Sequence, residues 1–87
     1  MRISRSTQET LQKILKSQGY QIRYEKGNFH GGYCLVMQKR MILINKFHPL
    51  ESKINAMAEI IRELEIDDSE LTDSQKRTVK RIKSDAS

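Results

Sequence analysis

Two apolar segments lie close together near the middle of the chain, and they constrain the fold more than any other feature. Residues 33–37 read Tyr-Cys-Leu-Val-Met, and residues 41–44 read Met-Ile-Leu-Ile. Runs of this length and composition are typical of strands that are covered on at least one face. Only Gln38, Lys39 and Arg40 separate them. We therefore expect a hairpin with a short polar turn.

A long amphipathic segment follows this hairpin. Pro49 suits the first position of a helix, where its missing N–H costs nothing. Apolar side chains then recur on one helical face, at Leu50, Ile54, Met57, Ala58, Ile61 and Leu64. Ile60 lies off this stripe and is expected to widen the buried face. The pattern predicts a helix over residues 49–64 with one side in the core.

The first part of the chain predicts a helix and then a strand. Ser6 and Glu9 have the spacing of a capping box, and Gly19 suits the position just after a helix, so we expect a helix over residues 7–18. From residue 20 to residue 25 apolar and polar side chains alternate, as in a half-buried strand. Residues 26–28 predict a turn, and the paired glycines at 31 and 32 predict a bulge or a close backbone approach.

The last part of the chain is expected to hold a weakly anchored helix. Leu71 is predicted to pack back onto the core, and Thr72 and Gln75 form a second capping box. Beyond them, only Val79 and Ile82 are apolar anchors. Like charges four residues apart weaken the helix further. We expect it to fray or to depend on a partner, and the last four residues to be disordered.

Together these segments predict an α+β fold of small size. The expected order is α-β-β-β-α-(α), and the simplest packing is a three-stranded antiparallel sheet with the helices on one face. Residues 1–71 form the single domain, and residues 72–87 form the basic terminal helix and tail. A chain of 87 residues buries only part of its surface on folding, so oligomerisation is one way to add stability.

Charge and cysteine content narrow the class of protein. Net charge is +5, with nine basic and two acidic residues in 1–50, two basic and seven acidic in 51–71, and five basic and two acidic in 72–87. Such a distribution attracts polyanions or a second copy of the chain, or it is a solvated surface. Cys34 is the only cysteine, and no leader or membrane span is evident. We therefore expect a cytoplasmic protein that does not enter a membrane.

Most catalytic signatures are absent from the sequence. There is no phosphate-binding glycine loop, no nucleophile elbow and no Cys or His pair with zinc-binding spacing. In one catalytic interpretation, Cys34 is a nucleophile and His30 is its base. In the alternative, Cys34 is a structural residue of a strand and His30 is an ordinary loop residue. His48 with Lys46 is a candidate anion site at the start of the long helix. We expect no catalytic residue, no metal and no cofactor.

A resemblance to a known family runs over residues 31–64. The strand Ile42–Asn45, then Pro49 and Leu50, then the helix containing Ala56–Glu59 resemble the core of the ImmA/IrrE-type metallopeptidases. In that family the helix carries a His-Glu-x-x-His zinc motif. The matching positions here are Ala58, Glu59 and Arg62, so both histidines are missing. The resemblance implies a similar fold without zinc and without catalysis.

Two functions follow from these observations. The first is a non-catalytic protein-interaction or self-associating module, whose pairing surface would be the strand over 20–25 or the face of Met37 and Met41. The alternative is nucleic-acid binding, with exposed tyrosines stacking on bases. The candidate surface for either partner is basic and comprises Arg23, Lys26, Lys39, Arg40, Lys46, Lys76, Arg77, Lys80 and Arg81. The positions of these residues in the fold distinguish the two functions, because binding to the phosphates of a nucleic acid requires the basic residues to converge on one surface.

Overall fold

The computed structural model describes residues 2–26 and 32–84 of the chain. Its elements are α1 (Arg5–Ser17), β1 (Gln21–Glu25), β2 (Tyr33–Val36), the 3-10 helix η1 (Met37–Lys39), β3 (Met41–Asn45), α2 (Leu50–Glu63), the 3-10 helix η2 (Asp68–Glu70) and α3 (Asp73–Ser84). The α+β class is confirmed, and the order differs from the prediction by the two 3-10 helices. None of the helices in the described ranges has the length and apolar character that a membrane crossing requires.

The sheet is mixed, so the prediction of a purely antiparallel sheet was wrong. Its strand order is β1-β3-β2, with β2 antiparallel to β3 and β1 parallel to β3. The hairpin pairs as expected, but β1 joins the far side of β3 instead of adding to β2. This arrangement places the most apolar strand in the centre, where both of its edges are paired.

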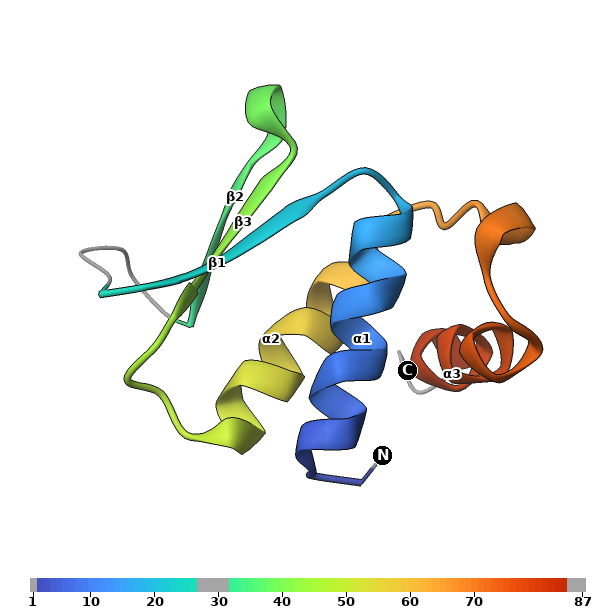
Figure 1. Ribbon diagram of the computed structural model, residues 1–87, viewed down its shortest axis with the longest axis horizontal. Helices are drawn as coiled ribbons and strands as arrows, with labels where there is room; N and C mark the ends of the chain where they lie inside the picture. The colour runs from blue at the N-terminus through green and yellow to red at the C-terminus, as the bar shows by residue number, and fades with distance from the viewer. Residues whose placement is uncertain (1, 27–31, 85–87) are drawn as a thin grey trace.

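The helices cover one face of the sheet and leave the other uncovered by any described helix (Figure 1). Ile42 and Ile44 of β3 point to the helices and are fully buried. Their neighbours in the register, such as Leu35 and Ile22, share this face and pack against the core. Since side chains alternate along a strand, the residues between them face the other way.

Helix α2 provides the largest share of the core. The predicted stripe is buried at Ile54, Met57, Ala58 and Ile61, whereas Leu50 and Leu64 at its ends are half-buried. Ile60 is also buried, which confirms that the buried face is wider than the stripe, and so is Ala56. Each large side chain that is fully buried contributes about 1.5–3 kcal/mol to the free energy of unfolding.

Two helix starts differ from the predicted ones. Helix α1 begins at Arg5 because Ser4, not Ser6, is its N-cap: the Ser4 hydroxyl accepts the Thr7 N–H at 3.1 Å. Pro49 is the N-cap of α2 and not its first helical residue. At the end of α1, Gly19 has φ +87°, so the glycine terminates the helix as predicted.

The hairpin connection is a 3-10 helix, which takes Met37 out of the predicted strand. It closes at Arg40, the only described residue other than glycine with a positive φ, at 47°. The turn predicted at residues 26–28 lies largely outside the described residues, and so does Gly31 of the predicted glycine pair. His30 lies there too.

Helix α3 packs on α2, on the side away from the sheet (Figure 1). Its capping box is confirmed in both directions, because Thr72 N–H donates to Gln75 Oε1 at 3.0 Å and Gln75 N–H donates to Thr72 Oγ1 at 3.1 Å. Val79 and Ile82 reach the core, as does Leu71 before the helix. How strongly the helix is anchored stays a prediction, and residues 85–87 of the predicted tail lie outside the described residues.

The substitution Ile82→Ala measures the anchoring of α3. If the helix is part of the cooperative core, removing this buried side chain lowers the free energy of unfolding by about 2–4 kcal/mol, since it leaves a cavity against α2. Urea unfolding followed by circular dichroism is the measurement. Lys80→Ala, on the exposed side of the same helix, is the control and should change stability by less than about 0.5 kcal/mol. A similarly small effect of Ile82→Ala would mean that α3 frays, as the sequence predicts.

Candidate functional site

The uncovered face of the sheet is apolar over two of its three strands. Cys34 and Val36 of β2 lie opposite Leu43 and Met41 of β3 in the register, and all four are half-buried. None of them belongs to the core cluster formed with the helices. Met37, which follows β2 directly, is 56% exposed. An apolar face of this kind on a small protein is a candidate interaction surface.

The two edges of the sheet differ in charge. On β1 the exposed side chains are Gln21, Arg23 and Glu25, and Arg23 Nε lies 3.7 Å from Glu25 Oε1. The four residues of β2 are Tyr33, Cys34, Leu35 and Val36, without a charge or a proline. Charged side chains and prolines are the usual means by which an edge strand avoids pairing with another chain. Edge β1 is therefore protected, and edge β2 is not.

A shallow polar hollow lies between β2 and α2. Its lining is Gly32, Tyr33, His48, Ser52, Asn55, Ala56 and Glu59, and its volume is about 270 Å³. Gly32 lies close to the imidazole of His48, since a Cβ at this position would lie 3.4 Å from His48 Nδ1. Burial, and then the carboxylates of Glu59 and Glu63, raise the pKa of the Tyr33 phenol.

The hollow does not have the donors of a metal site. On α2, the positions that face it with four-residue spacing are Asn55 and Glu59, so they supply one amide and one carboxylate. Arg62 points elsewhere, because its Nε donates to the Ile82 carbonyl of α3 at 3.5 Å. Within the two described ranges, no three His, Cys, Asp or Glu side chains are grouped so that they could hold a metal ion.

The nine predicted basic residues fall into three separate places. Arg23, Lys26 and Lys46 lie at the end of the sheet where β1 and β3 finish, because Lys46 N–H donates to the Glu25 carbonyl at 3.0 Å. Lys39 and Arg40 lie at the opposite end of β3, in the hairpin connection. The remaining four, Lys76, Arg77, Lys80 and Arg81, are on α3. The described structure does not bring all nine together.

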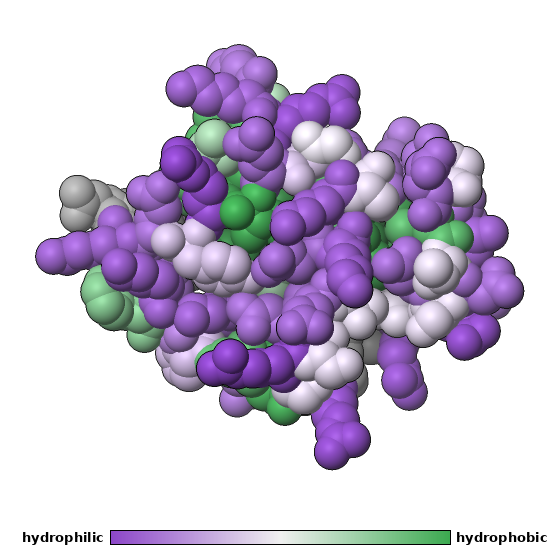
Figure 2. Space-filling model, in the orientation of Figure 1, coloured by the Kyte–Doolittle hydropathy of each residue, from purple (hydrophilic) through white to green (hydrophobic). Residues whose placement is uncertain are grey.

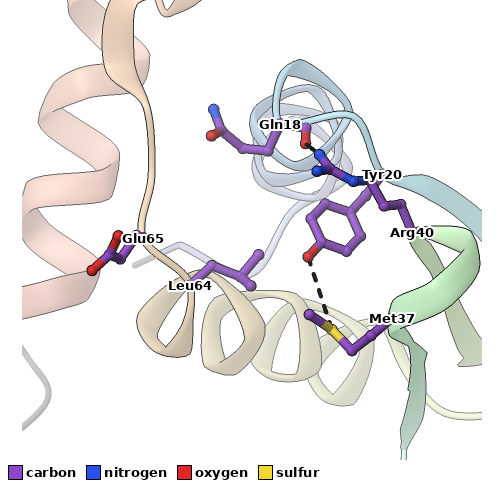
Figure 3. Close-up of a pocket in the computed structure, with 6 residues that line it drawn as sticks. All are labelled: Gln18, Tyr20, Met37, Arg40, Leu64 and Glu65. Atoms are coloured by element: carbon purple, nitrogen blue, oxygen red, sulfur yellow. Dashed lines mark hydrogen bonds between the residues drawn. The ribbon is translucent and has the colours of Figure 1, made fainter.

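Arg40 takes part in the packing of the hairpin against α1. It lines a hollow of about 340 Å³ with Gln18, Tyr20, Met37, Leu64 and Glu65, in which Arg40 and Glu65 lie on opposite sides (Figure 3). Arg40 Nη1 donates to the Gln18 carbonyl at 3.4 Å, at the end of α1. This contact places a cation against the negative end of a helix, which is a structural role.

The tyrosines proposed for base stacking pack against the core. All three are partly buried there. The Tyr24 hydroxyl donates to Gln12 Oε1 at 2.7 Å and accepts from Gln8 Nε2 at 3.0 Å, and the Tyr20 hydroxyl lies 4.0 Å from Met37 Sδ. These contacts hold the rings of Tyr20 and Tyr24 in place, so they are poor platforms for a base.

The sequence reasoning missed two adjoining hollows, one between α1 and α3 and one on α3 alone. One is lined by Arg2, Ser6, Thr7, Thr10, Thr78 and Arg81, and the other by Ser74, Arg77, Thr78 and Arg81. The α1 side was missed because hydroxyl residues on a helix have no functional signature of their own. Ser6 and Thr10 are four residues apart and share a helical face, whereas Thr7 lies one turn before Leu11, next to the core residues.

Comparison with known proteins does not add a relative: no family model, no curated protein and no solved structure matches this chain.

The substitution Glu59→Gln tests the electrostatics of the hollow between β2 and α2. Removing this carboxylate should lower the pKa of Tyr33, because the phenolate then forms next to one negative charge fewer. The measurement is a pH titration of the tyrosine ring carbons by NMR. Glu51→Gln, an exposed change at the start of the same helix, is the control and should leave the Tyr33 pKa unaltered. An unchanged pKa in Glu59→Gln would contradict the geometry.

Proposed function

We propose that this protein is a small non-catalytic interaction module that associates with a second copy of itself through the outer edge of β2. The observation that carries the proposal is the difference between the two sheet edges. Edge β1 has Arg23 and Glu25 on it, whereas edge β2 has neither charge nor proline. No described strand pairs with the outer side of β2.

Pairing at this edge satisfies two needs of the chain. An unpaired edge leaves a row of N–H and C=O groups without partners, and a second strand supplies them. A domain of 87 residues has a small core, so contacts with a second copy add stability that the single chain lacks.

The symmetry of such a dimer limits its geometry. Two copies of β2 related by a two-fold axis perpendicular to the sheet run antiparallel and extend it from three strands to six. Opposite residues then lie on the same face, so the axis passes through Cys34 or through Leu35. In either register the apolar faces of the two copies become one continuous face, with Cys34 and Val36 of each copy at the junction.

The proposal treats the protein as non-catalytic because the donors for zinc are lacking. The resemblance to metallopeptidases implies a zinc site on the helix that is α2 here. A catalytic zinc site requires three protein ligands, and the described residues that line the hollow beside α2 supply one imidazole and one carboxylate, from His48 and Glu59. The residues present do not fit the metal. Cytoplasmic location remains a prediction that rests on the single cysteine.

The dimer is tested by light scattering after size exclusion, with the substitution Val36→Lys. The unaltered protein should have twice the mass of one chain at high micromolar concentration. Val36→Lys should have the mass of one chain, because the ammonium group would be desolvated against the edge of the second copy.

Met41→Lys is the matched control for this experiment. Met41 lies opposite Val36 in the register and on the same face, but one strand inward. If pairing occurs at the edge, Met41→Lys remains a dimer. If both variants are monomeric and folded, the copies stack through their faces, and the edge proposal is wrong. A monomer for the unaltered protein contradicts self-association altogether.

Cross-linking at Cys34 gives a second test on the unaltered protein. In either register the two Cys34 residues lie directly opposite or diagonal to each other, within about 8 Å. A short bis-maleimide should therefore convert the protein to a covalent dimer, and Val36→Lys should abolish this product. Rapid single labelling without any dimer would count against β2 pairing.

A further inference from the structure

We infer that two adjoining hollows, one between α1 and α3 and one on α3 alone, form a binding site for the phosphate backbone of a nucleic acid. The site, called here the α1–α3 groove, consists of the residues that line both hollows. Three of them are arginines, Arg2, Arg77 and Arg81, and five carry hydroxyl groups, Ser6, Thr7, Thr10, Ser74 and Thr78. This inference is independent of the proposed dimer.

The lining has the composition that phosphate recognition requires. Guanidinium groups bind phosphate oxygens through paired N–H donors, and hydroxyl and guanidinium contacts make up a large share of those to nucleic-acid backbones. Among the described residues, no acidic side chain lines either hollow, although Glu9 and Asp73 are neighbours of lining residues in sequence. Within the described residues, the three arginines form no ion pair. Their charges are therefore available to a ligand.

The two hollows adjoin and together suit more than one phosphate. They share Thr78 and Arg81, and their volumes are about 220 and 350 Å³. Arg77 and Arg81 are four residues apart on α3, which places their Cβ atoms about 6 Å from each other on one face. Lys76 and Lys80 repeat this spacing on the same helix and are exposed. A row of cations fits a polymer of phosphates better than a single anion.

Among the described residues, arginine is the main side chain in the groove that also reads base edges. Its lining has no aromatic side chain for stacking and no asparagine or glutamine for pairing with base edges. Figure 2 shows hydrophilic side chains over most of the face viewed, with patches of hydrophobic residues between them. We therefore expect contacts mainly to the backbone, with little sequence preference.

Fluorescence anisotropy with labelled single-stranded oligonucleotides tests the inference. A mixed-sequence strand and a poly-dT strand of equal length should bind with similar affinity, and binding should weaken as salt increases, with a slope of log K against log salt of about −2 for three contacts. The double substitution Arg77→Gln/Arg81→Gln should weaken binding about tenfold and reduce the magnitude of this slope by more than one.

The matched control removes the same charge elsewhere. Lys39→Gln/Lys46→Gln lowers the net charge by the same two units at the ends of the sheet and should change affinity by less than about twofold. Equal losses in both double variants would mean diffuse attraction to a basic protein, and the groove would be rejected. Circular dichroism of each variant verifies that it is folded.

Competition distinguishes the backbone from smaller or different anions. At matched ionic strength, unlabelled oligonucleotide should displace the probe at far lower concentration than inorganic phosphate or a phosphopeptide. Equal displacement by a phosphopeptide, or no oligonucleotide binding at low salt, would overturn the assignment. Val36→Lys should bind the probe with the same affinity as the unaltered protein, because the groove is separate from the proposed dimer edge. The dimer and the groove are therefore tested separately.

Discussion

The packing of α2 against the central strand β3 is the contact on which the rest of the structure depends. Ile42 and Ile44 on the strand and Ile54, Met57 and Ile61 on the helix are fully buried, and they come from segments only a few residues apart in sequence. They are five of the nine large side chains that are fully buried among the described residues, so a large part of the hydrophobic stabilisation arises here. Helix α1 packs on α2 from one direction and α3 from another, and both depend on the same helix.

This concentration of the core on one side of the sheet decides which surfaces are left for partners. All three described α-helices lie on the same side of the sheet, with α3 beyond α2, so none of them covers the face that contains Cys34 and Leu43 (Figure 1). The same arrangement makes β2 an edge strand and opens a groove where α1 and α3 lie beside each other with little contact. The uncharged edge of β2 and the arginine groove lie on different parts of the fold, so the proposed dimer and the proposed nucleic-acid contact involve separate surfaces.

Prediction from the sequence succeeded where a signal was local. The hairpin, the periodicity of α2, the glycine after α1 and the capping box at Thr72 each depend on residues within one or two turns, and each was found. Errors arose where two local signals competed or where pairing partners were distant. Ser4 and Ser6 both suit an N-cap, and only the extended backbone at Ser4 decides between them. The parallel alignment of β1 with β3 has no local signature, because the chain between them contains another strand.

The candidate sites likewise have some properties that follow from the sequence and others that depend on tertiary packing. Sequence by itself determined that α3 is basic, that the chain lacks the histidines of a zinc helix and that β2 carries no charge, because these are properties of composition and spacing. Only the tertiary structure decided that β2 is an edge, that the basic residues separate into three places and that Arg2 and Thr10 lie beside Arg81. Those facts depend on how helices and strands distant in sequence pack together. Packing is driven by the burial of apolar faces, and the polar side chains on the opposite faces do not indicate which elements will become neighbours.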